Sequence, residues 1–374
     1  MSQAYFHGVT VHELKEGPVF YRRADFSSIG MICTMGADAD ADTFEYFKPT
    51  FLTGTTGREL AGAEGSLAIA LDAIYDQIAP RVLVVPIPAV AADEAEMEAN
   101  KIQAVRELEK AQAIYGFKPR ILGAPGLESL ALAQELVSMA DNTRAFFYGL
   151  ALAVTPEEAV QYRANFSSKR AMLFYPSFDD SAPEQSIRTA AGALGLRAKI
   201  DDEKSLARCI SNLPIQTNLS NVTDPIDWDL LDKNTKANYL NENEVTTIIQ
   251  RDGWRFWGSR TTSAEAEYAF ESVVRKGDQL LETIAQAQFD LMGNELVPAL
   301  ATTLLDEVQR GLDQDTVRSE LLGGKAYYAD GYNDITTLRD SQLHLHYDYT
   351  VPPPLEQMHL YSVNTGTYLV NALP

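Results

Sequence analysis

The chain has 374 residues, and its 52 Asp and Glu against 31 Lys and Arg give a formal net charge of −21. This acidity argues against nucleic acid or an anionic membrane as a partner, because both are bound through basic surfaces. The length allows two domains. No apolar run approaches a membrane span, and the N-terminal residues lack the pattern of a secretory signal, so we expect a cytosolic chain.

Short apolar runs alternate with amphipathic ones in the first half of the chain. We expect strands at residues 81–87, 119–123, 144–153 and 169–176, and helices at 93–115, 127–139 and from 155 onward. The last helix has a clear start, since Thr155 can cap it, Pro156 suits the first helical position and two glutamates follow. Four successive strand and helix units predict an α/β domain with a mostly parallel sheet.

The pattern changes beyond about residue 210. Residues 212–227 have the composition of a loop, and later segments favour an α+β arrangement, so we expect a domain boundary near residue 240. The expected elements are strands at 245–250 and 254–258, helices at 264–292 and 297–311, and strands at 325–329, 342–350 and 361–370. A stiff extended turn at residues 352–354 (PPP) should precede the last strand.

Both ends of the chain look like single strands. Residues 4–14 precede the first domain and residues 360–371 follow the polyproline turn, and both segments favour extended structure. An unpaired strand exposes backbone groups that other chains can bind. Each end must therefore pair either with its own chain or with a neighbouring copy.

Phosphate binding is the first chemistry that an α/β pattern suggests. The glycine-rich stretch at residues 54–62 lacks the Lys and Ser/Thr that end a P-loop, and residues 123–126 lack dinucleotide-binding spacing. Pro125 also removes a backbone donor. We interpret these glycines as turns between strands and helices, and expect no nucleotide cofactor.

A metal site is the second candidate, because all five histidines lie in the terminal segments. His344, His346 and Asp348 alternate along one predicted strand and share a face, so they could hold zinc if another ligand approached. Tyr347 and Tyr349 alternate with them, which is typical of a sheet with one wet face. We therefore expect no metal.

Catalytic residues are not evident either. The chain has no Gly-x-Ser-x-Gly segment, and its central α/β region contains no histidine. Cys33 and Cys209 are too few for a disulfide framework, and neither has a nearby histidine that would activate a thiol, so both should be buried apolar residues. We expect that the protein is not an enzyme.

Six segments, spread nearly from end to end of the chain, carry a family likeness. They are residues 7–11 (HGVTV), 118–126 (KPRILGAPG), 165–176 (NFSSKRAMLFYP), 193–201 (ALGLRAKID), 245–261 (VTTIIQRDGWRFWGSRT) and 347–356 (YDYTVPPPLE). Together, and in the same order, they resemble the short tail sheath proteins of contractile-tailed temperate phages and R-type bacteriocins.

The resemblance implies a structural subunit that polymerises as stacked rings around a tail tube and contracts to drive the tube through a bacterial envelope. No nucleotide is consumed, because the extended sheath is metastable and stores energy in subunit contacts. The implied partners are other copies of the chain, the tube protein, and baseplate and tail terminator proteins, without nucleic acid or membrane. The implied location is a virion tail or bacteriocin particle assembled in the host bacterial cytoplasm.

The resemblance also implies an organisation in four parts. Residues 1–20 would be an N-terminal arm joining the inner sheet, 21–240 an outer α/β domain, 241–355 an inner α+β domain facing the tube, and 356–374 a C-terminal arm. The arms would add strands to neighbouring subunits.

The resemblance assigns three groups of residues. The inter-subunit arm strands contain His7, Gly8, Val9, Thr10, Val11, Tyr361, Val363, Tyr368 and Val370. The acceptor strand contains Leu343, Leu345, Tyr347 and Tyr349. Arg275 and Lys276, on an inner-domain helix, are candidate tube contacts, although such a pair can also simply face solvent.

One alternative remains from a different class. The alternation of strands and helices also fits a cytosolic α/β enzyme that binds a small phosphorylated ligand. That interpretation rests on fold analogy alone.

Overall fold

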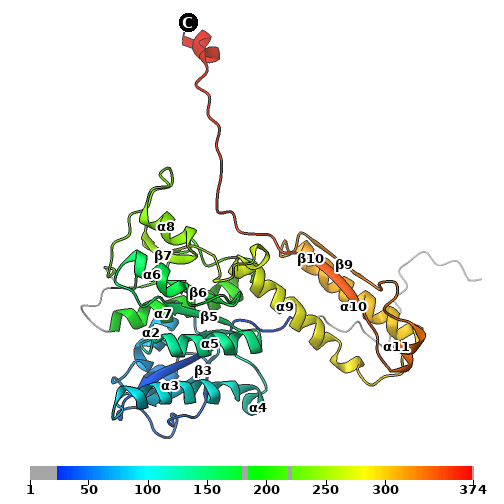
Figure 1. Cartoon of the computed structure of the whole chain (residues 1–374), viewed down its shortest axis with the longest axis horizontal. Helices are drawn as coiled ribbons and strands as arrows, with labels where there is room; N and C mark the ends of the chain where they lie inside the picture. The colour runs from blue at the N-terminus through cyan, green and yellow to red at the C-terminus, as the bar shows by residue number, and fades with distance from the viewer. Residues whose placement is uncertain (1–22, 179–183, 218–220, 373–374) are drawn as a thin grey trace, which may run out of the picture.

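The structure is a computed structural model that describes residues 23–178, 184–217 and 221–372. A large sheet with helices on both faces forms one unit (Figure 1). A smaller unit with two long helices and a two-stranded sheet lies beside it, and the C-terminal segment extends away from both (Figure 1).

The large sheet has eight strands in the order β2-β3-β1-β4-β5-β6-β7-β8. Its central strands run parallel, and β2 and β8 join the two edges antiparallel. The strands are β1 (Ile29–Met35), β2 (Thr50–Leu52), β3 (Val82–Pro88), β4 (Ile121–Gly123), β5 (Phe146–Leu150), β6 (Ala171–Phe174), β7 (Val245–Gln250) and β8 (Trp254–Trp257). The predicted mostly parallel sheet is therefore confirmed.

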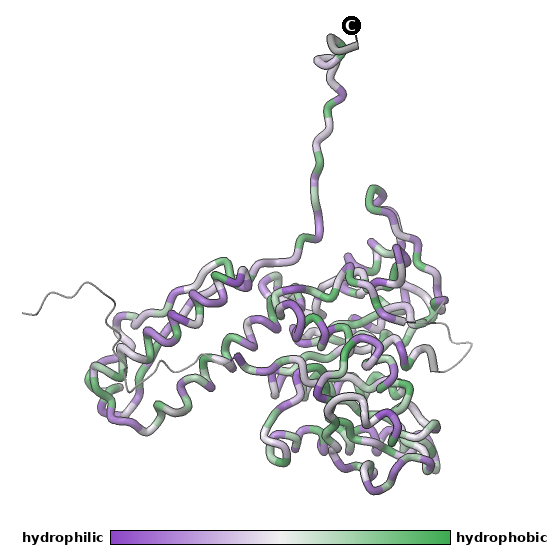
Figure 2. The backbone as a smooth tube through the Cα atoms, turned by 180° about the vertical axis from the view of Figure 1, so that it is seen from behind, coloured by the Kyte–Doolittle hydropathy of each residue, from purple (hydrophilic) through white to green (hydrophobic). Residues whose placement is uncertain are grey.

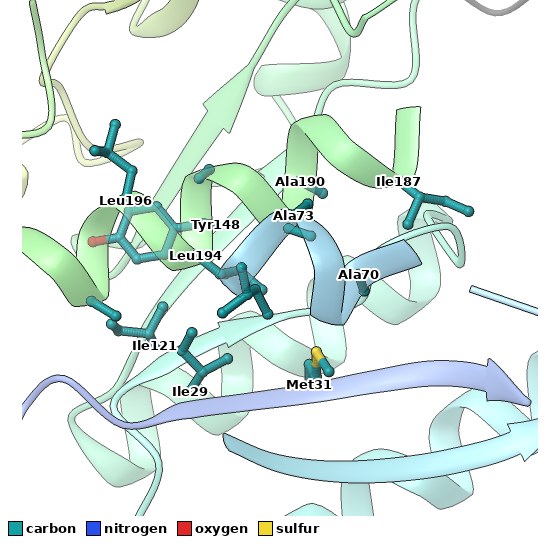
Figure 3. Close-up of a cluster of buried hydrophobic side chains, with 14 of the residues drawn as sticks. Ile29, Met31, Ala70, Ala73, Ile121, Tyr148, Ile187, Ala190, Leu194 and Leu196 are labelled. Atoms are coloured by element: carbon teal, nitrogen blue, oxygen red, sulfur yellow. The ribbon is translucent and has the colours of Figure 1, made fainter. Parts of the chain in front are cut away.

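Two pairs of helices cover the sheet. On one face, α2 (Leu67–Tyr75) packs on α7 (Glu184–Glu203), and their apolar side chains meet those of the strands (Figure 3). A Cβ at Gly195 would lie 2.9 Å from the Cα of Ile74, so glycine permits this close packing. On the other face, α3 (Glu94–Glu109) packs on α5 (Leu130–Thr143).

The shorter helices of this unit are α1 (Gly57–Leu60), α4 (Ala111–Tyr115), α6 (Pro156–Arg163) and α8 (Lys236–Glu242). The predicted start of α6 is confirmed, because the Thr155 hydroxyl accepts a hydrogen bond from the Glu158 amide at 3.3 Å. The helix expected at residues 93–115 is divided at Lys110 into α3 and α4.

The smaller unit packs α9 (Glu271–Ala287) and α10 (Pro298–Val317) against β9 (Gly323–Tyr327) and β10 (His346–Thr350). Short helices η1 (Ala266–Tyr268), η2 (Phe289–Leu291) and α11 (Ile335–Arg339) complete it. Its core consists of Leu280, Ile284, Val308, Leu312, Leu321, Ala326 and Val351. Within the three described ranges, no helix is both long and apolar enough to cross a membrane.

Two expectations need correction. The predicted boundary near residue 240 is wrong, because β7 pairs in parallel with β6 and extends the large sheet to β8 at Trp257. Residues 361–370 do not form a strand in the single chain. They are irregular up to Thr365 and then form η3 (Gly366–Ala372), since a strand needs a neighbouring strand to bond its backbone.

Candidate functional site

Helix α9 is the junction between the two units (Figure 1). Its carboxylates Glu271, Asp278 and Glu282 pair with four arginines of the large unit, namely Arg120, Arg144, Arg170 and Arg197. Their spacing of seven and four residues places the three carboxylates on one side of the helix. The other side of α9 packs on the smaller unit.

A fully buried ion cluster forms the N-terminal end of this junction. Arg197 contacts Asp201 at 2.6 Å and Glu271 at 3.1 Å, and Arg275 contacts the other Asp201 oxygen at 2.6 Å. Each side chain is at most 1% exposed. Two cations and two carboxylates balance in charge, which buried ions require. The cluster therefore fixes α9 to α7.

Tyr148 on β5 completes the cluster. Its hydroxyl donates a 2.6 Å hydrogen bond to Glu271 and accepts one from Arg275 at 3.1 Å. Burial raises the pKa of Tyr148 well above its ordinary value, so the group stays a neutral phenol that can donate. The cluster thus reaches from α9 through α7 to the central sheet.

Two further contacts continue the junction along α9. Arg170 forms a bidentate pair with Asp278, with distances of 2.7 and 2.6 Å. Glu282 contacts Arg120 at 3.2 Å and Arg144 at 3.0 Å. Paired, oriented contacts of this kind restrict rotation as well as separation.

A second ion cluster ties the N-terminal segment to the smaller unit. Lys276 contacts Asp315 and Glu320 at 2.7 Å each, and Arg23 contacts the same carboxylates at 2.6 and 2.7 Å. The backbone of Ala24 also bonds to side chains of α9. The described chain therefore begins against the smaller unit.

Arg275 and Lys276 are buried inside the subunit. Arg275 is 1% exposed and Lys276 is fully buried. Both side chains form ion pairs within the subunit, so neither offers an exposed cation for the expected contact with a tube. Sequence alone shows a basic pair on a helix and does not show the distant carboxylates that pair with it.

The two-stranded sheet has one protected edge. On β9, the Ala326 amide donates to the Gln309 side chain of α10 at 2.9 Å, and the same side chain donates to the Gly324 carbonyl at 3.3 Å. These backbone groups face away from β10 because they bond to α10 rather than to the ladder. Helix α10 thus occupies the position that another strand would take.

Strand β10 is the other edge. It pairs antiparallel with β9, with Tyr347 opposite Ala326, and no second neighbouring strand occurs among the residues that the structure describes. Tyr347 and Tyr349 lie in β10 with ring centroids 6.1 Å apart, whereas Leu343 and Leu345 precede the strand. Burial raises the pKa of Tyr349 to about 12.

The C-terminal arm is attached at its root. The Glu356 carboxylate contacts Arg260 at 2.7 Å and accepts a hydrogen bond from Ser259 at 3.3 Å. No Asp, Glu, Lys or Arg occurs after Glu356. The arm then projects from the molecule (Figure 1), and most of its large apolar side chains are exposed: Met358 66%, Leu360 84%, Tyr361 94%, Val363 84%, Tyr368 73% and Leu369 73%.

The structure thus brings some predicted arm residues into one segment. Tyr361 and Val363 lie in its extended part, and Tyr368 and Val370 lie in η3. His7, Gly8, Val9, Thr10 and Val11 lie outside the described residues.

The histidine and cysteine residues considered for metal binding or thiol chemistry pack against other side chains of the fold. Over the described part of the chain, no group of three or more His, Cys, Asp or Glu is arranged to hold a metal ion. The His346 ring stacks on Tyr327 and meets Tyr332 edge-on, with centroids 5.8 and 4.6 Å apart. Cys33 and Cys209 are buried, and burial raises the pKa of Cys33 to about 12.

Several important residues were not predicted. The first buried cluster contains the i,i+4 pairs Arg197 with Asp201 and Glu271 with Arg275, a spacing that the sequence does show. Such pairs are usually interpreted as surface pairs, so the signal was present but ambiguous. Nothing in the sequence marks Gln309 as the cover of a strand edge.

Comparisons with known proteins identify close relatives. The family model described as phage tail sheath protein central domain matches residues 97–262. The tail sheath protein of Escherichia phage P2 is 33% identical over an alignment that covers 98% of this chain and 97% of the relative. The major tail sheath protein of Serratia phage KSP20 is 32% identical with the same coverage.

Solved structures show the same fold. An extracellular contractile injection system, the PVC sheath complex in its contracted state, matches with a TM-score of 0.71 and 13% identity, covering 98% of this chain and 99% of that one. A chain of the anti-feeding prophage baseplate matches with a TM-score of 0.71 and 12% identity, covering 97% and 99%.

Proposed function

The chain belongs to the phage tail sheath protein family, and we propose that its terminal arms are the contacts through which subunits polymerise around a tail tube. As a family member it is a structural subunit of a contractile tail or related particle. The alternative of an α/β enzyme with a phosphorylated ligand has no support from the comparisons.

The single observation that carries the arm proposal is the solvent exposure of residues 357–372. They hold exposed large apolar side chains, and each would contribute about 1.5–3 kcal/mol if fully buried. A segment that exposes this much apolar surface in one subunit is suited to being buried in another. The arm has no Asp or Glu side chain, so it can dock on an acidic neighbour without repulsion between carboxylates.

The proposed acceptor is the open edge of β10 in a neighbouring subunit. Since α10 covers the β9 edge, an added strand must approach from the β10 side. Backbone hydrogen bonds would supply affinity, and alternate arm side chains would supply specificity. Residues 7–11 of the N-terminal arm are proposed to act in the same mesh, because Arg23 fixes the start of the described chain beside this sheet's unit.

The ion clusters suggest how force passes through a subunit. They tie α9 to both units with buried, bidentate contacts, so we propose that the two units move together during contraction. The energy of contraction would then reside in contacts between subunits. Baseplate and terminator proteins, and assembly in the host bacterial cytoplasm, belong to the same proposal.

Contact with a tail tube is proposed through the smaller unit. Because Arg275 and Lys276 are buried, an exposed helical face must take this role. Helix α10 offers Asp306, Arg310 and Asp313 on one exposed side.

Electron microscopy of the purified chain tests the arm proposal. The full chain should form tubes, and a chain ending at Gln357 should remain folded but not assemble. A sharper pair of variants uses strand alternation: Tyr361→Ser with Val363→Ser should block tubes, and the matched control Ser362→Ala with Asn364→Ala should not. Tubes from the truncated chain would refute the proposal.

A further inference from the structure

We propose that the loop carrying Leu230 and Leu231 docks into the groove between α3 and α5 of a second copy of this chain, forming a head-to-tail contact between large units. We call residues 228–232 the finger. This inference rests on the proposed function, because it adds a contact to the same homopolymer.

The finger presents two leucines to solvent. Leu231 is 98% exposed and Leu230 is 59% exposed. Figure 2 shows the projecting loop with a hydrophobic tip between hydrophilic flanks. The flanks are Asp229 and Asp232, so the tip combines an apolar pair with two negative charges. Contiguous exposed apolar surface is a feature of protein interaction sites, and the two adjacent leucines form such a surface at the tip.

The finger has hydrogen bonds along its own loop and a ring contact at its base. The Asp229 and Asp232 carboxylates accept hydrogen bonds from the amides of Leu231 and Asn234, at 2.6 and 2.8 Å. At its base, the Trp228 ring lies 6.1 Å from that of Trp257. A pre-organised loop loses little conformational freedom when it binds, which favours docking.

The groove has the complementary chemistry. It has a volume of about 560 Å³ and is lined by Glu98, Ala99, Ile102, Gln103, Arg106 and Ala131. Ile102 and the two alanines give it an apolar wall. Glu98 is already paired with Lys101 and accepts a hydrogen bond from Ser129 at 2.9 Å.

Arg106 therefore decides the charge of the groove. Its side chain is exposed and makes no ion pair within the described ranges. An apolar wall beside one free cation matches an apolar tip between two carboxylates. Another copy of the chain is the occupant that supplies this tip, and the homopolymer brings copies together at high local concentration.

The positions of the two surfaces fit a polymer. The finger precedes α8, which packs on β7 near one end of the sheet, whereas α3 packs on β3 near the other end. A contact between different surfaces at opposite ends of a subunit can repeat head to tail from one copy to the next. It generates rings or helices, which are the forms that a sheath requires.

Cysteine crosslinking tests the contact directly. Leu231→Cys combined with Ala131→Cys should, on oxidation of assembled tubes, give a ladder of covalent oligomers on a denaturing gel. The matched control replaces Ala131→Cys by Glu59→Cys, which is exposed on α1 beside α2, the helix on the opposite face of the sheet. The native Cys33 and Cys209 are buried and should not contribute.

A second pair of variants measures the contribution of the leucines. Leu230→Ser with Leu231→Ser should raise the concentration needed for assembly at least tenfold. The control Val317→Ser, at a side chain that is 85% exposed on α10, should leave it unchanged.

The outcomes separate this inference from the proposed function. Tubes with a ladder only in the Ala131 variant support the contact. Tubes without a ladder, or with equal ladders in both variants, overturn the finger contact and leave the arm proposal intact. A wild-type chain that never forms tubes contradicts the proposed function, and this inference with it.

Discussion

Removing one buried cation at the junction should destabilise the subunit strongly. In Arg275→Met, Asp201 would lose its 2.6 Å contact and keep only Arg197, and the Phe26 carbonyl would lose a 2.9 Å hydrogen bond. Breaking a buried ion pair on one side costs about 3–5 kcal/mol. An unfolding entropy of about 2.1 cal/mol/K per residue over 374 residues corresponds to about 1.3 °C per kcal/mol, so the melting temperature should fall by about 4–6 °C.

Calorimetry of the unassembled chain, with urea unfolding as a second probe, measures this effect. The matched control is Arg310→Met, because Arg310 is an exposed arginine on α10 and its loss should change the melting temperature by no more than a degree. Adding Asp201→Asn to Arg275→Met should recover part of the lost stability, because the uncompensated carboxylate is then removed. A loss below about 1 kcal/mol with failed assembly would refute the reasoning and favour an intermolecular role for Arg275.

Three further predictions concern the strand edge, the half-buried acid Glu128 and the arm root. Gln309→Ala should cost about 1–2 kcal/mol in urea unfolding, because the Ala326 amide loses its acceptor; an unchanged unfolding midpoint would contradict the edge-cover role. Burial raises the pKa of Glu128 from 4.5 to about 7. As pH rises, the unfolded chain loses the Glu128 proton at about pH 4.5, whereas the folded chain keeps it until about pH 7, so the folded state loses stability between these two values. Glu128→Gln removes this ionisation. In thermal melts it should therefore stabilise the protein by about 1–3 kcal/mol at pH 8 and have no effect at pH 4. Equal effects of Glu128→Gln at both pH values would contradict the raised pKa of Glu128. Glu356→Ala should keep the melting temperature but slow tube formation in light scattering, since the arm root is released; an unchanged rate would show that the Arg260 contact does not orient the arm.

Local patterns in the sequence identified β3 to β6 and the helices between them, whereas β1, β2 and α2 were not predicted. The β-branched run of β3 and the Thr155 cap of α6 are determined by neighbouring residues, so periodicity and capping rules identify them. The boundary failed at β7 because its parallel partner β6 lies some 70 residues earlier, across an irregular segment that looks like a linker. Strand pairing over such a separation produces no pattern in the neighbouring residues from which it could be predicted.

The candidate functional surfaces could also be predicted only in part from the sequence. Composition identifies the C-terminal arm as β-prone and apolar, but only the structure shows that Glu356 anchors it and that its end adopts η3 in a free subunit. The Arg275 and Lys276 pair looked exposed because its partners, Asp201 and Asp315, come from distant helices. Ion pairs between remote segments depend on the tertiary fold and cannot be predicted from spacing on one helix.

A cryo-electron microscopy reconstruction of tubes assembled from the full chain tests the central claim most directly. The account predicts that residues 357–372 of one subunit lie along the free edge of β10 in a neighbour, with backbone hydrogen bonds to that strand and with η3 unwound where it pairs. Density in which the arm folds back on its own subunit, or leaves β10 unpaired in the tube, would contradict it.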